Sequence, residues 1–302
     1  MKILLANNAL NHFYGTETWT YTMAKELIKE HEVEVFTFYK GLMSDRISKF
    51  CKIVDSIDDN YDLAIINHTS CFNLVPKSIF RIFTSHSLIN TIELFPEGAD
   101  KCVAITEEIA RDKFPIIRNG IDCDRFNYLR PINNELKKVL YLSHPHYGGG
   151  DKDMLGNACT SMGIKLLTIN EQIWNMPDAI KEVDLVVGFG RGILEAMACG
   201  RNVISADYRP YYMRYFSGGG FVDENNFDEL KKFNFTGRGD KQIIFTKESI
   251  KEEFGKYNCN KGTWLRGKIL SEFNVKKTAR QYLDLYTNRQ LYVKRNEDFL
   301  QR

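Results

Sequence analysis

The stretch GFGRGILEAMACG, residues 188–200, follows the apolar run LVV at 185–187 and contains a second apolar segment. Gly188 and Gly190 predict a tight turn between a buried strand and a helix that begins shortly after Gly190. The first turn of such a helix exposes unpaired N–H groups and the positive end of the helix dipole, which favours a phosphate. Glu195 is expected in or just after that turn, where it either caps the helix or accepts hydrogen bonds from a ribose diol.

Short apolar runs alternate with amphipathic segments on both sides of this stretch. The runs that predict strands are residues 3–6, 33–38, 63–66, 79–84, 102–105, 139–143, 164–169, 185–188 and 203–206. Residues 17–30 place Met23 and Leu27 on one helical face. Thr16 is available as the N-cap of this helix. Alternating strands and helices predict an α/β protein with parallel sheets that are covered on both faces.

The chain is long enough, at 302 residues, for two domains of ordinary size. The polar, proline-containing segment 129–138 predicts a linker between them. We therefore expect two Rossmann-like domains, one over residues 1–133 and one over residues 134–275. Ligands of such sheets bind at the carboxyl ends of the strands, and a cleft between two domains is a favoured place.

Composition and charge exclude several classes of protein. The hydrophobic fraction of 43% is that of an ordinary globular protein, and no apolar run approaches the ~20 residues that cross a bilayer. The N-terminal apolar run is too short for a signal peptide and predicts a strand. The seven cysteines include no C-x-x-C pair, which predicts reduced thiols in a cytoplasmic protein. A net charge of +2 is too small to imply a polyanionic partner.

Several motifs follow one another in a characteristic order. They are YGTE at 14–17, NGID at 119–122, GFG at 188–190, EAMACG at 195–200 and GGFVD at 219–223. Together they resemble the motifs of the GT-B glycosyltransferases, in particular those of the retaining glycosyltransferase family 4. The resemblance implies two Rossmann-like domains that face a central cleft, with the acceptor mainly on the first and a nucleotide-sugar donor mainly on the second. It also implies that residues 276–302 form a helix or helices that pack back toward the N-terminal domain.

The resemblance further implies roles for individual residues. Those expected to bind the donor are Gly15, His144, Gly188, Phe189, Gly190 and Glu195, and those expected to take part in catalysis are His86, Lys152 and Arg191. His86 follows a predicted strand, as does a family histidine that contacts the donor sugar or the acceptor; a loop histidine bonded to backbone is the alternative. His144 stands where the family has an arginine, so Lys152 and Arg191 are expected to neutralise the diphosphate.

One departure from the family pattern concerns the residue before the GFG motif. The family has a glutamate there that helps to hold the transferred sugar, and this chain has Val187. The pattern DKD at 151–153, with histidines nearby, has the side-chain types of a metal site, but short patterns of this kind often arise by chance. We therefore expect no metal ion and no cofactor, because cationic side chains and helix N–H groups can bind the diphosphate.

The expected activity is that of a hexosyl- or pentosyltransferase that moves a sugar from a nucleotide sugar to an acceptor hydroxyl with retention of the anomeric configuration. The sequence allows four classes of acceptor: a glycan, a lipid-linked sugar, a small molecule and modified DNA. One alternative is a viral-type enzyme that acts on hydroxymethylated bases in DNA. Another is a non-catalytic nucleotide-binding protein of the same architecture. Basic residues near the C-terminus form a solvated face or allow peripheral contact with a membrane.

Overall fold

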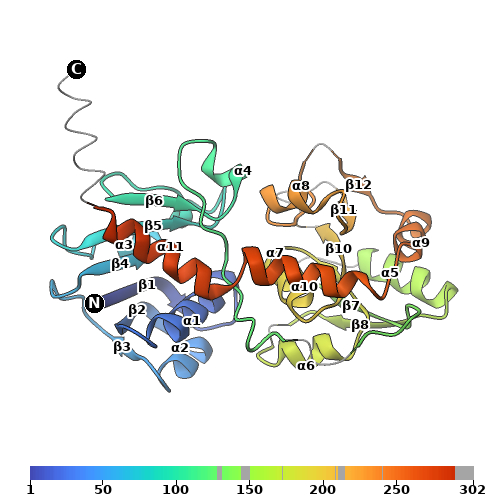
Figure 1. Cartoon of the computed structure of the whole chain (residues 1–302), viewed down its shortest axis with the longest axis horizontal. Coiled ribbons are helices and arrows are strands. Elements are labelled where there is room, and N and C mark those ends of the chain that lie inside the picture. Colours follow the sequence, from blue (N-terminus) through green and yellow to red (C-terminus); the bar gives the residue numbers. More distant parts are fainter. Residues whose placement is uncertain are drawn as a thin grey trace. The chain divides into compact units, whose positions relative to one another are not determined.

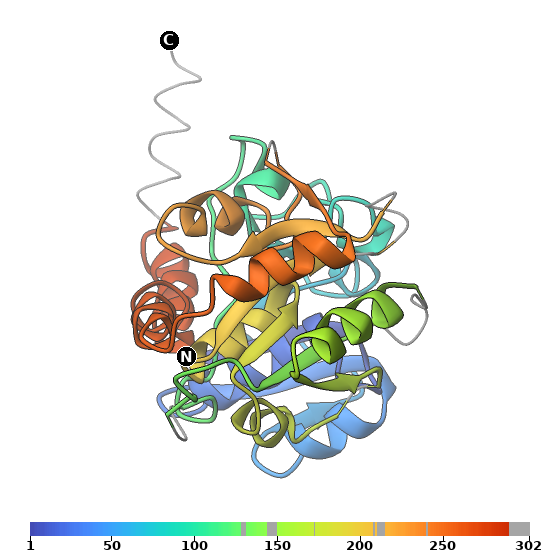
Figure 2. The ribbon, with the colours of Figure 1, turned by 90° about the vertical axis from the view of Figure 1, so that its right-hand side faces the viewer.

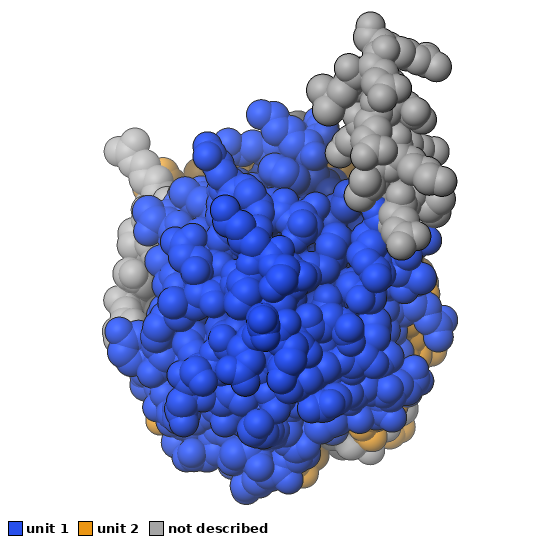
Figure 3. All heavy atoms as spheres, turned by 90° about the vertical axis from the view of Figure 1, so that its left-hand side faces the viewer, with its two compact units in different colours: residues 1–120, 275–302 blue, residues 121–274 orange. Residues whose placement is uncertain are grey.

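The computed structural model describes residues 1–127, 131–143, 150–171, 173–207, 209, 215–239 and 241–289. The chain divides into two compact units (Figure 3). Unit 1 combines Met1–Gly120 with Val275–Arg302, and unit 2 is Ile121–Asn274. Within the described residues, each unit is organised around a sheet of six strands.

Unit 1 is built on a parallel sheet with the strand order β3-β2-β1-β4-β5-β6 (Figure 1). Its strands are β1 (Lys2–Leu10), β2 (Glu32–Lys40), β3 (Lys52–Val54), β4 (Leu63–Ile66), β5 (Phe80–Ser85) and β6 (Lys101–Ala104). Its helices are α1 (Gly15–Leu27), α2 (Leu42–Ile47), α3 (Thr69–Phe72), the short 3-10 helix η1 (Thr91–Glu93), α4 (Glu107–Ala110) and α11 (Val275–Thr287). This strand order is that of a Rossmann fold.

The two faces of the unit 1 sheet are covered by different helices, because successive strand residues point to opposite faces. Leu4 of β1 packs in a cluster with Phe72 of α3. Helices α1 and α11 pack against each other, and Tyr282 of α11 contacts Trp19 of α1 edge to face, with ring centroids 5.8 Å apart. The hydroxyl group of Tyr282 lies 2.9 Å from Thr84 Oγ1, which fixes α11 to β5.

Helix α1 begins earlier than the sequence predicted. Its first residue is Gly15 and its N-cap is Tyr14, so Thr16 lies inside the first turn. The carboxylate of Glu17 accepts hydrogen bonds from the backbone N–H groups of Tyr14, at 2.6 Å, and His12, at 3.3 Å. Burial raises the pKa of Glu17, and these backbone hydrogen bonds partly oppose the rise. Glu17 therefore fixes the start of α1, the role that the sequence had assigned to Thr16.

Unit 2 is built on a mixed sheet with the strand order β12-β11-β10-β9-β7-β8 (Figure 2). Its strands are β7 (Lys138–Leu142), β8 (Lys165–Ile169), β9 (Leu185–Gly188), β10 (Asn202–Asp207), β11 (Ser217–Phe221) and β12 (Ile243–Ile244). Its helices are α5 (Gly150–Ser161), α6 (Met176–Lys181), α7 (Gly190–Ala198), α8 (Phe227–Lys232), α9 (Lys247–Gly255) and α10 (Lys261–Glu272). Strands β7 to β10 pair in parallel, whereas β11 and β12 are antiparallel.

Two apolar clusters pack on the two faces of the unit 2 sheet. Val186 of β9 belongs to a cluster with Met197 of α7. Its neighbour Val187 belongs to the other cluster, with Leu155 of α5 and Phe254 of α9. Because β9 is buried on both faces, its sequence is continuously apolar rather than alternating.

The boundary between the units lies earlier in the sequence than the predicted linker 129–138. Ile121 is fully buried in the core of unit 2, so the chain enters that unit directly after Gly120. It returns to unit 1 at Val275, the first residue of α11. A Cβ on Gly120 would lie 2.8 Å from the Cα of Val275, so glycine allows these two segments to pass closely. The predicted segment 276–302 is described only as far as residue 289.

Candidate functional site

The carboxyl ends of β7 and β9 form the topological switch point of the unit 2 sheet. Strand β7 pairs with β8 on one side and with β9 on the other, so the connections that leave β7 and β9 run in opposite directions. Ligands of open α/β sheets bind at such a point. The GFG motif joins Gly188, the last residue of β9, to Gly190, where α7 begins slightly earlier than the sequence predicted.

The glycines of this turn allow α7 to approach the end of β7. Gly190 has a φ of +57°, in the left-handed region that glycine adopts without strain. A Cβ on Gly188 would lie 3.2 Å from the Cβ of Leu142, the last residue of β7. A Cβ on Gly192 would lie 2.5 Å from Cδ1 of the same leucine. The first turn of α7, with its N–H groups, therefore lies at the switch point.

Glu195 lies in the second turn of α7 and is buried, with 8% of its surface exposed. Its Oε1 atom accepts a hydrogen bond from Arg191 Nε at 2.8 Å. Burial raises the pKa of Glu195, while the positive charges of Arg191 and Arg125 oppose the rise. Because the N-cap is Phe189, Glu195 is too far along α7 to cap it, and the capping explanation is wrong. Glu195 is therefore a buried carboxylate that Arg191 holds at the edge of the sheet where a ligand is expected to bind.

Arg125, whose positive charge acts on Glu195, packs against an aromatic side chain. Its guanidinium group stacks on the indole ring of Trp174, 3.8 Å from the ring centroid, and donates a hydrogen bond to the Trp174 carbonyl oxygen. Trp174 follows β8, whose carboxyl end lies at the same edge of the sheet as that of β7. Sequence reasoning missed Trp174. The signal that could have found it is a large aromatic residue just beyond the carboxyl end of a predicted strand.

Phe189 of the GFG motif is covered by a second arginine. The guanidinium group of Arg209 lies 4.0 Å from the centroid of the Phe189 ring. Two nitrogen atoms of Arg209 donate to the carboxylate of Asp207, with Nε–Oδ1 at 3.0 Å and Nη2–Oδ2 at 2.6 Å. Asp207 is fully buried at the end of β10. The bidentate pair holds a positive charge beside the GFG turn, and sequence reasoning missed both of its members.

Lys152 lies in the first turn of α5, the helix that follows β7, and its side chain is exposed. His144 lies outside the described residues, as does the side chain of Asp151. In the part of the chain that the structure describes, no three His, Cys, Asp or Glu side chains form a group that could hold a metal ion. Independence from metal stays a prediction.

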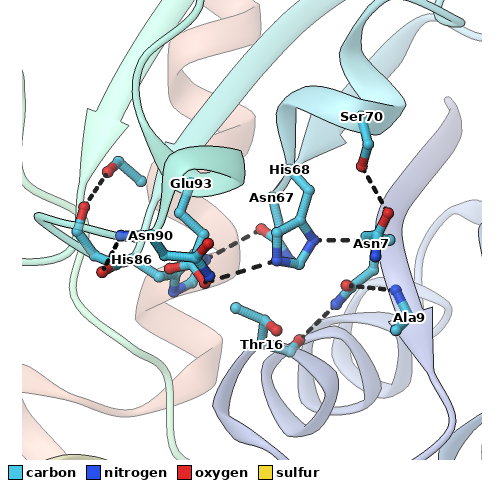
Figure 4. A network of polar contacts seen from close by, with 12 residues as sticks. Asn7, Ala9, Thr16, Asn67, His68, Ser70, His86, Asn90 and Glu93 are labelled. Atoms are coloured by element: carbon cyan, nitrogen blue, oxygen red, sulfur yellow. Dashed lines mark hydrogen bonds and ion pairs between the residues drawn. The ribbon is translucent and has the colours of Figure 1, made fainter.

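A network of polar side chains lies at the corresponding switch point of unit 1, between β1 and β4 (Figure 4). Asn7 Nδ2 donates hydrogen bonds to Thr20 Oγ1, at 2.8 Å, and to the Thr16 carbonyl oxygen, at 2.9 Å. Asn67, which follows β4, donates to the same Thr20 hydroxyl group at 3.4 Å. These contacts fix the ends of both strands against α1.

His86 follows β5 and joins this network (Figure 4). Its Nε2 atom lies 3.2 Å from Asn67 Oδ1, and its ring contacts Trp19 edge to face, with centroids 5.6 Å apart. The side chain of His86 is partly exposed. The structure thus places His86 at the edge of the unit 1 sheet where ligands bind.

His68 and Glu93 form the buried part of the same network. His68 Nδ1 accepts a hydrogen bond from the Asn8 backbone N–H at 3.1 Å, and its Nε2 lies 3.8 Å from Glu93 Oε1. In a neutral imidazole this arrangement places the proton on Nε2, toward Glu93. Burial alone would raise the pKa of Glu93, but its interactions with His68, His86 and Asn90 outweigh burial and lower the pKa. Glu93 is therefore a buried negative charge close to His86.

Apart from Lys152 and His144, the predicted site residues fall into two groups. Gly188, Phe189, Gly190, Arg191 and Glu195 are brought together in unit 2 at one strand-to-helix turn. Gly15 and His86 belong to unit 1. A Cβ on Gly15 would meet no atom within 4 Å, so the packing of unit 1 does not require glycine at this position. The assignment of Gly15 to donor binding stays a prediction.

The fold of the chain is similar to that of solved glycosyltransferases. HepE from Anabaena, solved in complex with UDP-glucose, has 14% sequence identity and a TM-score of 0.64, and the match covers 95% of this chain and 100% of that chain. A glycosyltransferase from Rickettsia africae ESF-5 also has 14% identity and a TM-score of 0.64, with 96% and 98% covered. An α-glucosyltransferase (AGT), solved in complex with UDP, has 11% identity and a TM-score of 0.57, with 95% and 99% covered.

These likenesses show that the chain has the fold of the GT-B glycosyltransferases, and the predicted fold class is confirmed. In sequence, no family model and no curated protein matches the chain. The resemblance to family 4 in particular stays a prediction. All seven cysteines are thiols and not disulfides. None of the helices in the described part of the chain is long and apolar enough to span a bilayer.

Proposed function

We propose that the protein is a cytoplasmic glycosyltransferase that moves a sugar from a nucleotide sugar to an acceptor hydroxyl with retention of the anomeric configuration. The donor site is assigned to unit 2, at the turn between β9 and α7. The acceptor site is assigned to unit 1, around His86. No metal ion or cofactor has a role in this proposal.

One observation carries the proposal: Glu195 is a buried carboxylate directly behind a glycine turn at a topological switch point. A buried carboxylate is costly unless it is paired, and Arg191 holds this one in a single orientation. A carboxylate can accept two hydrogen bonds, as a ribose diol would donate, while the N–H groups at the start of α7 face a phosphate. The structures of HepE with UDP-glucose and of AGT with UDP add support, because both share the fold.

The proposed reaction needs no protein nucleophile. The bond between the anomeric carbon and the diphosphate oxygen breaks, and both electrons go to that oxygen. The acceptor oxygen bonds to the anomeric carbon on the same face, and its proton passes to the leaving phosphate. Lys152 and the N–H groups of α7 stabilise the growing negative charge. Arg191, which the resemblance assigned to neutralising the diphosphate, pairs with Glu195 and orients it in this proposal.

A non-catalytic nucleotide-binding protein is the second candidate, and Val187 favours it. The family pattern has a sugar-binding glutamate at this position. Val187 instead packs in the core of unit 2 and is 1% exposed, so it cannot contact a donor sugar. A protein that had lost this contact would retain the nucleotide site without the transfer.

The two candidates differ in a direct assay. The full-length protein is incubated with UDP-, GDP-, ADP- and dTDP-sugars. Nucleotide release is followed by phosphorus NMR, and the anomeric configuration of the sugar product is followed by proton NMR. Release of nucleoside diphosphate from a donor, with the same anomeric configuration in the sugar product, supports the retaining transferase. Saturable binding of a donor without any release identifies the non-catalytic protein, and inversion in the product refutes retention.

A further inference from the structure

Unit 1 contains a pocket beside His86, and the pocket is separate from the polar network described above. Its volume is about 310 Å³, at the lower end of the range for ligand sites. Ser85 and Ser87, the neighbours of His86 in the sequence, form one side of it. The remaining side chains that line it come from residues 88–95 and 109–114. All of these residues lie within unit 1.

The inner wall of the pocket is apolar. Phe95 and Phe114 stack on each other with ring centroids 4.0 Å apart and an interplanar angle of 32°. Ile109 is buried, whereas Leu94 is 41% exposed at the rim. Apolar walls with an exposed leucine at the edge suit a ligand with an apolar chain, because burial of that chain stabilises the complex.

Two cations stand at the rim of this apolar pocket. Arg111 and Lys113 both line it and are both exposed. In the part of the chain that the structure describes, neither side chain has a hydrogen bond or an ion pair. Two cations without a protein partner next to apolar walls match an anionic group attached to an apolar chain. Arginine and lysine together are typical ligands of phosphate.

The backbone that carries these cations is strained. Arg111 and its neighbour Asp112 have φ angles of 48° and 57°, although neither is glycine. The turn is held at both ends: Arg111 N–H donates to the Glu107 carbonyl oxygen at 3.0 Å, and Ile117 N–H donates to the Ala104 carbonyl oxygen at 2.9 Å. Strain of this kind persists only where the surrounding structure imposes it, and it is concentrated at ligand sites.

We propose that this pocket binds the apolar chain of an amphiphilic acceptor, and that Arg111 and Lys113 bind the phosphate group of that acceptor. The inference rests on the proposed function, since it names the class of acceptor that unit 1 presents to His86. The ligand chemistry is a phosphate ester of an apolar alcohol, with the acceptor hydroxyl group carried on the other side of the phosphate.

The test is a calorimetric titration of the full-length protein, without nucleotide sugar, with decyl phosphate below its micelle-forming concentration. The comparison ligands are inorganic phosphate and 1-decanol. We expect decyl phosphate to bind at least about tenfold more tightly than either comparison ligand, because only it uses both the cations and the apolar wall. Equal affinity for inorganic phosphate or for decanol would overturn the proposal.

Variants separate the two parts of the pocket. Arg111→Gln combined with Lys113→Gln should weaken binding of decyl phosphate about tenfold at low salt. The matched control is Lys49→Gln with Lys77→Gln, which removes the same charge from two exposed lysines near the amino ends of β3 and β5, at the opposite edge of the sheet. Leu94→Ser, at an exposed position, should weaken binding through the apolar chain. Equal losses in the control, or no loss in the first variant, would overturn the assignment.

These measurements are independent of the donor site. Decyl phosphate binds to unit 1 in the absence of a nucleotide, so its failure to bind leaves the assignment of unit 2 unaffected. Conversely, absence of nucleotide binding would refute the proposed function while the calorimetry still reports on the pocket.

Discussion

Replacement of Glu195 by glutamine keeps the size of the side chain and removes its charge. In the structure this carboxylate is buried and pairs with Arg191 at 2.8 Å. Hydrogen bonds to a charged group contribute about 1.5–3 kcal/mol, and every 1.4 kcal/mol changes an affinity about tenfold. If Glu195 accepts hydrogen bonds from the ribose diol, Glu195→Gln should therefore weaken the binding of the nucleoside diphosphate by at least about tenfold.

The assay for this prediction is isothermal titration of the nucleoside diphosphate whose sugar the protein binds. The matched control is Glu253→Gln. Glu253 is also buried in unit 2, but it lies on α9 and pairs at 2.6 Å with Lys256, the C-cap of that helix. Its Oε2 accepts the backbone N–H of Phe221. Both variants should lower the melting temperature, since each leaves a cation without its buried partner. Equal nucleotide affinity in wild type and Glu195→Gln would refute the ribose assignment and return Glu195 to a structural role.

The other predictions concern Lys152, His86, the metal and Glu93. Lys152→Gln should lower kcat by about 10²-fold, because the charge on the diphosphate grows in the transition state, while Lys165→Gln at the opposite edge of the sheet should have no effect. His86→Ala should impair transfer and leave nucleoside diphosphate affinity unchanged; an affinity loss as large as that of Lys152→Gln would contradict the assignment of His86 to the acceptor site. Transfer should survive EDTA, and rescue of a lost activity by manganese would show that metal is needed. The pKa of Glu93 is lower in the folded state than the value of about 4.3 in the unfolded chain, so ionised Glu93 stabilises the fold above that pH. The stabilisation is lost as the pH falls through the folded-state pKa, and the difference in unfolding free energy between wild type and Glu93→Gln should shrink between pH 7 and pH 3 in urea titrations.

The central strands were predicted well from the sequence, because parallel strands that are buried on both faces have continuously apolar sequences. Strand β9, Leu185–Gly188, is the clearest example. Strand β11 was not predicted, since its sequence SGGGF has few residues that favour strands. It pairs with β10, where Gly218 packs closely against Ser205. These residues are distant in the sequence, so no local sequence pattern indicates the contact.

The site residues that lie in one sequence motif were predicted. The site residues that come together only in the folded chain were missed. Glu195 and the glycines share a single turn, so their spacing along the chain is already informative. The pair of Arg125 and Trp174 joins residues far apart in the sequence. The start of α1 was misplaced for a related reason, because Glu17 accepts the backbone N–H groups ahead of the helix and Thr16 was the more familiar N-cap.

The central claim is that a nucleotide sugar binds at the turn between β9 and α7. Hydrogen exchange measured by mass spectrometry tests this with the donor present at about 100 times its dissociation constant, a concentration that adds about 2.7 kcal/mol to the free energy of unfolding of the protein. We expect the amide groups of residues 188–198 to exchange more slowly with the donor than without it, and Glu195→Gln to reduce this protection. Unchanged exchange over residues 188–198, with protection confined to residues 1–120, would contradict it.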